Sequence, residues 1–118
     1  MEQNVCKTQF DNLKEKIRVV FSTSFILRCA KLEDNTIYND IFNNNEIVKI
    51  LKNEEIIKTA KIFLDNDLNL SKSSKKWFLH RNTMIYRINK IKQIMGLDIR
   101  VFADAVLFSN MLEIYKSF

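Results

Sequence analysis

A run of four polar residues, His80, Arg81, Asn82 and Thr83, opens a segment with helical periodicity. Side chains of these types can hydrogen-bond to base edges and to phosphates. On a helical wheel of about 100° per residue, the apolar residues of this segment fall in one narrow arc and polar residues fall opposite. The apolar arc contains Met84, Ile88, Ile91 and Met95; the opposite side contains Thr83, Tyr86 and Lys90, with Arg87 at its margin. The pattern predicts a helix with one core face and one wet, charged face.

Positive charge is concentrated around this segment. Eight of the 19 lysines and arginines lie between Ser71 and Arg100, where Asp98 is the only acid, whereas acids outnumber bases in the rest of the chain. A basic segment of this kind is typical of a surface that meets a polyanion, and a solvated lysine face is the alternative.

Other candidate chemistry fails on spacing. The run 65-DNDLNLS-71 begins like a calcium loop, but its sixth position is Leu70 and its twelfth is Lys76, where glycine and a bidentate glutamate are needed. His80 has no serine, cysteine or paired carboxylate at a spacing suited to a general base, and neither of the two cysteines has a metal-ligand spacing with it. We therefore expect no enzyme, no metal and no cofactor, and two reduced thiols.

The elements that position the polar run are predicted to be helices. The 118 residues contain no proline and one glycine, so hairpins and tight βα loops lack their usual turn residues and an all-α, single-domain fold is favoured. Apolar periodicity predicts a long amphipathic helix over about 7–32 and short helices over 36–42 and 47–51, with breaks at 33-EDNT-36 and 43-NNN-45. A further helix is predicted over 54–65. A helix over 71–79, with Ser71 as its cap and with Trp77 and Phe78 buried, precedes the polar-headed helix. The last helix spans about 101–116.

The sequence suggests neither a secretory signal nor a membrane-spanning segment. The amino-terminal residues carry acids and lack the apolar core of a secretory signal, and the longest apolar cluster, 19-VVFSTSFIL-27, is too short to span a bilayer. We expect a cytoplasmic protein.

Two helices joined by a short turn, the second beginning with polar residues, form the plan of a helix-turn-helix. In that plan the second helix enters the major groove with its amino end first. Its first turns then meet base edges, and its free N–H groups and positive dipole end favour phosphates.

The same residues resemble a known family. The string 70-LSKSSKKWFLHRNTMIYRINKIKQIMGLDIRVFADAVLF-108 is similar to the carboxy-terminal helix-turn-helix of PucR-type transcriptional regulators, which include carbohydrate-diacid regulators and share an H-R-N-T-x-x-Y-R-x-x-K/R-I core before G-L-D. Upstream, 59-TAKIFLDNDLNLS-71 is similar to the approach to that motif. The sequence departs from the family pattern at Lys75, where small residues are usual, and at Ile85, where a basic residue is common. The resemblance implies a DNA-binding domain over 36–118. Residues 1–35 lie outside the resemblance, and apolar periodicity alone predicts an amphipathic helix there.

The resemblance and the helix-turn-helix plan together assign roles. We expect Arg81, Asn82 and Thr83 to reach base edges, with Tyr86 and Lys90 further along the groove. Phosphate contacts are expected mainly from Lys72, Lys76, His80 and Arg87. The alternative for Arg87 is a structural ion pair with an acid such as Asp98 or Asp104.

The predicted function is a sequence-specific transcriptional regulator that binds double-stranded DNA at the nucleoid. Two alternatives stay open: a Fis-like architectural or recombination accessory factor, and a protein-interaction module that binds a recombinase or a component of the transcription machinery. A homodimer is expected, because one helix-turn-helix makes few base contacts. The amino-terminal helix would provide its interface or, alternatively, cover its own core; the apolar residues are Phe10, Leu13, Ile17, Val20, Phe21 and Phe25.

Overall fold

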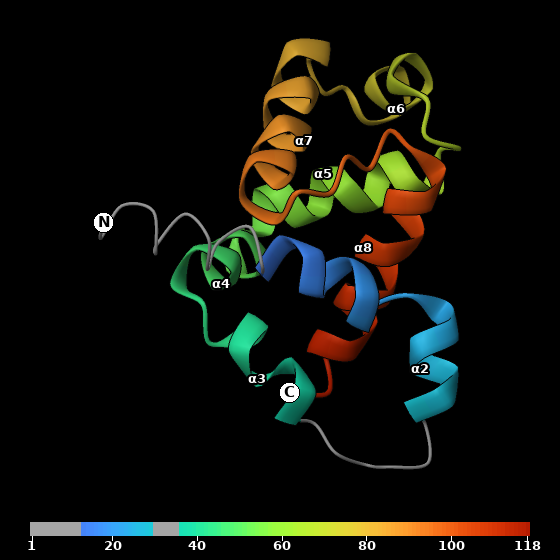
Figure 1. Cartoon of the computed structure of the whole chain (residues 1–118). Helices are drawn as coiled ribbons and strands as arrows, with labels where there is room; N and C mark the ends of the chain where they lie inside the picture. Colours follow the sequence, from blue (N-terminus) through green and yellow to red (C-terminus); the bar gives the residue numbers. More distant parts are fainter. Residues whose placement is uncertain (1–12, 30–35) are drawn as a thin grey trace.

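The computed structural model describes residues 13–29 and 36–118, and every regular element in these two ranges is a helix. Residues 13–20 form a first helical segment, followed by α2 (Thr23–Cys29) and α3 (Thr36–Phe42). The chain continues through α4 (Asn45–Lys52), α5 (Glu54–Asp65), α6 (Leu70–Trp77), α7 (Arg81–Met95) and α8 (Phe102–Tyr115) (Figure 1). The predicted all-α helix-turn-helix bundle with an added amino-terminal amphipathic helix is confirmed. No helix within the described ranges is long and apolar enough to cross a membrane.

The single long helix predicted over 7–32 is wrong, because the chain turns at Phe21 and Ser22 between residues 13–20 and α2. The Ser22 hydroxyl donates to the carbonyl of Val19 at 2.7 Å and accepts from the amide of Phe25 at 3.3 Å. A serine that bonds to nearby backbone groups competes with helical hydrogen bonds and can end one helix and cap the next. Apolar periodicity continues across the break and hides it. Phe10, Cys6 and the predicted break over 33–35 lie outside the described residues.

Asparagine side chains set two of the following boundaries. Asn44 accepts hydrogen bonds from the amides of Glu46 and Ile47 at the start of α4, at 3.0 and 3.1 Å. Asn53 accepts from the amide of Ile56 at 3.1 Å and so caps α5. Each cap satisfies N–H groups that a helix leaves free in its first turn. These residues confirm the break predicted around residues 43–45 and the helix predicted to follow Asn53.

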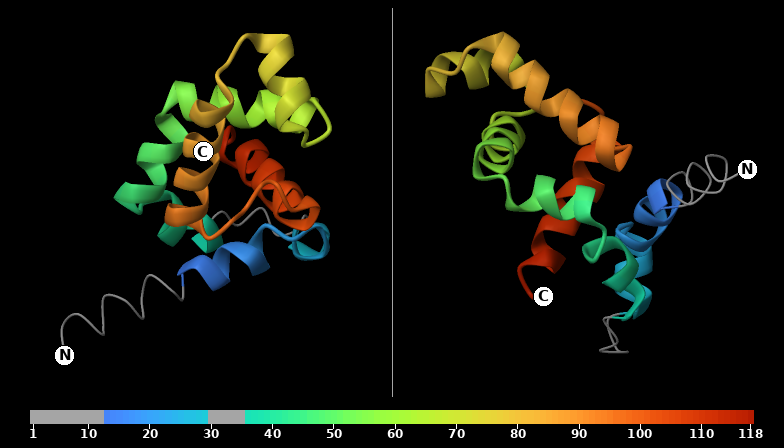
Figure 2. Two further views of the ribbon diagram at one scale, coloured as in Figure 1. Left: turned by 90° about the horizontal axis from the view of Figure 1, so that it is seen from above. Right: turned by 90° about the vertical axis from the view of Figure 1, so that its left-hand side faces the viewer.

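The core is assembled around α5, α7 and α8. The apolar face predicted for α7 is confirmed, since Met84, Ile88, Ile91 and Met95 are fully buried. Phe63 of α5 and Phe108 and Met111 of α8 are also fully buried in this cluster. The two views in Figure 2 and the view in Figure 1 place α6 and the first turns of α7 at the end of the molecule opposite α2 and α3. The second helix of the motif is therefore held by its core face while its amino end projects.

The amino-terminal stripe packs on this same chain. Ile17 and Phe21 are fully buried and Val20 nearly so, and all three belong to the common core. The Phe21 ring stacks on Tyr38 with a centroid distance of 5.2 Å. Phe42 of α3 in turn lies 5.1 Å from the ring of Tyr115 at the end of α8. The stripe that was a candidate dimer interface thus contributes to the intramolecular core.

A polar connection joins the amino-terminal segment to the end of α7. Arg18 donates to both carboxylate oxygens of Asp104, at 2.8 and 3.1 Å, and to the carbonyl of Gly96 at 2.7 Å. Asp104 also accepts from the amide of Asp98 at 2.9 Å. Gly96 ends α7 with a φ of 74°, a left-handed conformation that glycine adopts without the strain of a side chain. The backbone after α7 is therefore fixed from both sides, by the glycine cap and by the Asp104 carboxylate.

Two carboxylates of this connection have perturbed acidities. Arg100 donates to Asp98 at 2.8 Å and holds the pKa of Asp98 below its ordinary value of 3.8. Burial acts to raise the pKa of Asp104, but the hydrogen bonds from Arg18 and from the Asp98 amide outweigh it, so the pKa of Asp104 also lies below 3.8. A carboxyl whose pKa is lower in the folded state stabilises that state above the unfolded pKa.

Acid should therefore destabilise the fold through these groups. Their contribution to the free energy of unfolding is complete above pH 3.8 and is lost as the pH falls through the folded pKa values. Asp104→Asn should cost about 2 kcal/mol near neutral pH, because charged hydrogen bonds are lost, and should flatten the acid limb of stability against pH. Urea unfolding followed by circular dichroism measures both. Asp40→Asn, at an exposed carboxylate paired with Lys16, should leave the acid limb as in the wild type. An unchanged acid limb in Asp104→Asn would contradict the assignment.

Candidate nucleic-acid interface

The candidate interface is the unit of α6, the three residues 78–80, and α7. α6 has 8 residues and α7 has 15, and the two helices pack against each other and against α5. This is the helix-turn-helix arrangement predicted from the sequence. The amino terminus of α7 lies at the exposed end of this unit, and the free N–H groups and the helix dipole there favour anions.

Two serines shape the turn. Ser73 is fully buried, and its hydroxyl donates to the carbonyl of Asn69 at 2.7 Å. Ser74 donates to the carbonyl of Leu79 at 2.8 Å, while its own carbonyl accepts from the amide of Leu79 at 3.2 Å. Small side chains at these two positions let α6 lie close to its neighbours. Lys75, which departs from the usual small residue, points outward and is exposed.

The predicted cap of α6 is wrong by two residues. α6 begins at Leu70, and Asn69 caps it by accepting from the amide of Lys72 at 2.9 Å. Ser71 lies inside the helix and is exposed. Asp67 and Leu68 both have positive φ, of 61° and 56°, and turn the chain sharply after α5. This turn places Asn69 at the N-cap position of α6. The sequence contains no glycine there, and Asn66 and Asp67 are only a weak signal for a left-handed turn.

The prediction that Trp77 and Phe78 are buried is also wrong. Trp77 is 48% exposed at the last residue of α6, and Phe78 is 96% exposed. Phe78 is the C-cap of α6 with a φ of 54°, so a phenylalanine occupies the left-handed position that glycine usually takes. This backbone conformation directs its side chain into solvent. Apolar character alone predicted burial, whereas the tight turn decided the direction.

His80 caps α7. Its Nδ1 accepts a hydrogen bond from the amide of Asn82 at 3.1 Å, and its backbone is extended. A neutral imidazole that accepts at Nδ1 carries its proton on Nε2, so the ring keeps one donor for a second partner. The ring itself is exposed. The same side chain can therefore start the helix and donate to an anion.

The outer face of α7 is open. Arg81, Asn82 and Tyr86 are exposed, Tyr86 to 67% of its surface, and Thr83 and Lys90 are partly exposed. No acid occurs between residues 70 and 97. Thr83, Tyr86 and Lys90 lie on the side of α7 opposite the buried residues, while Arg81 and Asn82 are exposed in its first turn. This face can donate and accept hydrogen bonds in a negatively charged groove.

Arg87 points elsewhere. It donates to the hydroxyl of Thr59 at 2.9 Å and to the carboxylate of Glu55 at 3.3 Å, both on α5, and its side chain is 20% exposed. Arg87 therefore forms a structural ion pair, as in the alternative considered above, but with Glu55 and not with Asp98 or Asp104. Asp98 is bound by Arg100, and Asp104 by Arg18. The bond from Arg87 fixes α7 on α5.

The lysines of α6 differ in their surroundings. Lys72 forms an ion pair with Asp67 at 2.8 Å, and this bond lowers the pKa of Asp67. Lys76 is exposed and has no ion pair or hydrogen bond among residues 13–29 and 36–118. Lys76 is therefore free to meet a phosphate, whereas Lys72 must exchange Asp67 for it. Within the same ranges, no group of three or more histidine, cysteine or acidic side chains could hold a metal ion.

Comparison with known proteins gives this region a family. Residues 56–114, from the first turn of α5 to the last turn of α8, match the family described as the PucR C-terminal helix-turn-helix domain. A helix-turn-helix is a DNA-binding and not a catalytic class of domain, in agreement with the prediction that this is not an enzyme. No solved structure matches the chain.

Three curated proteins illustrate the similarity. The purine catabolism regulatory protein of Bacillus subtilis is 24% identical over 75 residues, which is 64% of this chain and 14% of that protein. The carbohydrate diacid regulator of Escherichia coli is 43% identical over 42 residues, 36% of this chain and 11% of that protein. The uncharacterized protein YxkF of Bacillus subtilis is 42% identical over 53 residues, 45% of this chain and 18% of that protein. The chain spans less than a fifth of the length of each of these relatives.

The observed cap of α6 predicts a difference between two neighbouring substitutions. Asn69→Ala should lower the free energy of unfolding by about 1 kcal/mol, because the amide of Lys72 loses its acceptor. Ser71→Ala, at an exposed position inside the helix, should change it by less than about 0.5 kcal/mol. Urea denaturation of both variants measures the difference. The reverse order would restore Ser71 as the cap.

Proposed function

The chain belongs to the family of PucR C-terminal helix-turn-helix domains, and we propose from this that it binds double-stranded DNA as part of a transcriptional regulator. The observation that carries the proposal is the outer face of α7, where Arg81, Asn82 and Tyr86 are exposed and where residues 70–97 contain no acid. Such a protein would act at the nucleoid, in the cytoplasm.

In the proposed complex, the amino end of α7 enters the major groove. Arg81, Asn82 and Thr83 then read base edges, because side chains in the first turns of a recognition helix come closest to the floor of the groove. Tyr86 and Lys90 follow one and two turns later on the same side. Ile85, which is partly exposed, offers an apolar contact where related proteins commonly have a basic side chain.

Phosphate contacts are proposed for the ends of the unit. Lys76 is exposed and unpaired within the described residues, and the Nε2 proton of His80 is available while Nδ1 caps α7. Lys72 can join them by giving up Asp67. Arg87 acts on DNA mainly as a positioning residue in this proposal, since its guanidinium bonds to Glu55 and Thr59 and so orients α7.

Two other functions would use the same fold differently. A Fis-like architectural or recombination accessory factor would recognise the shape and flexibility of DNA, so it would bend its site and tolerate base changes at the contacted edges. A protein-interaction module, with a recombinase or a component of the transcription machinery as partner, would not bind duplex DNA even at low salt. Arg81, which is exposed and has no ion pair or hydrogen bond within residues 13–29 and 36–118, favours base reading over both.

A homodimer remains part of the proposal, with its interface moved. Ile17, Val20 and Phe21 are buried within the chain, so residues 13–29 are proposed to cover the domain's own core. The start of α8 offers another apolar surface, since Val101 is 51% and Phe102 75% exposed beside a hollow of about 340 Å³. A two-fold axis there would pair two recognition helices for two half-sites.

DNA reading predicts two kinds of mutant. Arg81→Ala should cost about 1–3 kcal/mol at the preferred site and relax base preference, whereas Lys76→Ala should weaken all sequences alike. For the wild type, the logarithm of affinity should fall against the logarithm of salt with a slope of about −0.9 per phosphate neutralised. Fluorescence anisotropy with duplexes selected from random DNA measures these quantities.

The control is Lys49→Ala, which removes an exposed charge on α4 outside the unit and should leave affinity nearly unchanged. Strong bending of circularly permuted fragments together with flat mismatch costs would favour the architectural function. Absence of duplex binding at low salt would end the proposal of groove reading.

The dimer interface has its own test. Phe102→Asp should convert the dimer to a monomer, because it places a charge in the apolar contact, and should spare stability because Phe102 is exposed. Light scattering at micromolar concentration measures the mass. A monomeric wild type would exclude the dimer, and a dimeric Phe102→Asp would exclude this interface.

A further inference from the structure

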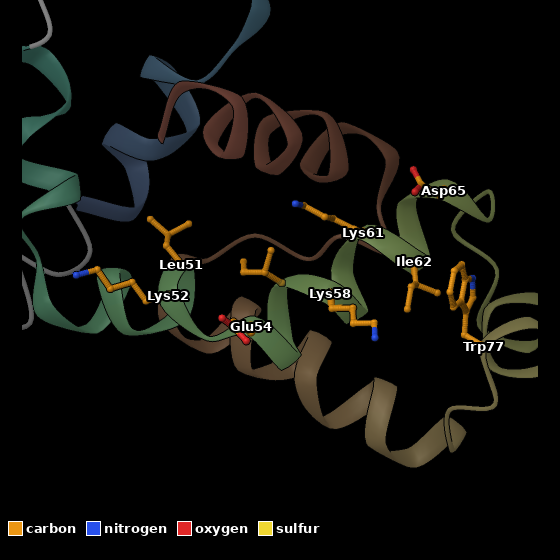
Figure 3. A pocket seen from close by; sticks show the side chains of 9 residues that line it. Leu51, Lys52, Glu54, Lys58, Lys61, Ile62, Asp65 and Trp77 are labelled. Carbon is orange, nitrogen blue, oxygen red and sulfur yellow. The ribbon is translucent and has the colours of Figure 1, made fainter. Parts of the chain in front are cut away.

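A groove runs along α5 on a surface that the proposed DNA contacts do not use. It has a volume of about 430 Å³ and is lined by the end of α4, by α5 and by the last residue of α6, with no residue of α7. Its apolar part comes from Leu51, Ile57, Ile62 and Trp77. Figure 3 shows the Trp77 ring standing beside Ile62 at one end and Leu51 at the other. Nearly half of the Trp77 surface is exposed here, although indole is among the most apolar side chains.

Three lysines surround this apolar floor. Lys58 and Lys61 are three residues apart on α5, and Lys52 ends α4 (Figure 3). All three are exposed, and none has an ion pair or hydrogen bond within residues 13–29 and 36–118. The acids of the groove, Glu54 and Asp65, lie at the first and last residues of α5. The groove therefore combines an apolar floor with three unpaired lysines and the two acids Glu54 and Asp65.

A second hollow of about 200 Å³ continues the groove toward α7. It shares Lys58, Ile62 and Trp77 with the first and adds Arg87 with its partner Glu55. The two hollows together lead from the end of α4 to the flank of the recognition helix. An occupant of the groove would thus contact Trp77, which directly precedes Phe78 and its left-handed turn into α7.

We propose that this groove binds a short acidic, amphipathic segment of a partner protein, with a large apolar side chain placed against Trp77 and carboxylates placed against Lys52, Lys58 and Lys61. The basic rim complements acidic side chains, and the apolar floor complements an apolar anchor, as in the docking of an amphipathic helix. DNA fits less well. A continuous phosphate backbone has no apolar group to place against the floor of Leu51, Ile57, Ile62 and Trp77.

The only tryptophan of the chain reports on the groove directly. The probe is a set of 15-residue peptides selected by display on the whole chain, with apolar residues fixed at positions i and i+4 and with Glu, Gln or Lys allowed at the flanking positions. Selected peptides should be rich in Glu. They should shift the Trp77 emission to the blue as the indole leaves water, whereas the same peptides with Lys for Glu should not.

Two double variants with equal charge change separate the possible occupants. Lys58→Glu with Lys61→Glu should weaken the acidic peptide about tenfold or more, because like charges then face each other, and should leave DNA affinity within about twofold. Lys76→Glu with Lys90→Glu changes residues outside the groove and should do the opposite. Thermal unfolding by circular dichroism checks that both variants fold.

The outcomes are distinguishable from those for DNA reading. Loss of DNA affinity in the Lys58 and Lys61 variant would make the groove a phosphate contact and overturn the proposal. A change in molecular mass for that variant alone would make it a contact between copies of this chain and overturn it as well. Selection of peptides without acidic bias, or without an effect on Trp77 emission, would also end it. Failure of the second variant to lose DNA would count against the proposed DNA reading and leave the groove proposal standing.

Discussion

The carboxylate of Asp104 is the contact on which the position of the recognition helix depends. It lies near the start of α8 and is almost buried, so its charge must be compensated where it stands. Arg18 and the amide of Asp98 supply that compensation, and Arg18 also reaches the carbonyl of Gly96. One acid thus joins the amino-terminal segment, the end of α7 and α8. Arg87, in the middle of α7, holds this helix on α5. Because these two contacts and the buried face of α7 fix the rotation of the helix, its outer face points to solvent.

Much of this arrangement could be predicted, because the strongest signals in the sequence are local. The apolar face of α7 and the extent of α5 follow from apolar periodicity. Those features act within a few residues, so a single sequence carries them in full. The residues of α7 outside the apolar arc of the helical wheel were expected to be exposed, and the structure agrees with that expectation.

The failures have two physical causes. Ser22, Asn69 and Phe78 sit where a side chain or a left-handed backbone overrides periodicity, and none of these positions is marked by glycine or proline. The second cause is distance along the chain. Arg18 and Asp104 are 86 residues apart, and Arg87 and Glu55 are 32 apart, so acid and base could be seen in the sequence but not matched. The exposure of Trp77, and with it the groove along α5, could not be foreseen for the same two reasons.

The neutral caps of the helices have a consequence for how the molecule responds to its ionic surroundings. Asn44, Asn53 and Asn69 carry no charge, so the boundaries of α4, α5 and α6 are insensitive to counterions. The bonds that orient α7, from Arg18 and Arg87, are ionic and partly exposed, so they weaken as counterions accumulate. Rising ionic strength would then loosen the mutual orientation of intact helices before it melts any of them.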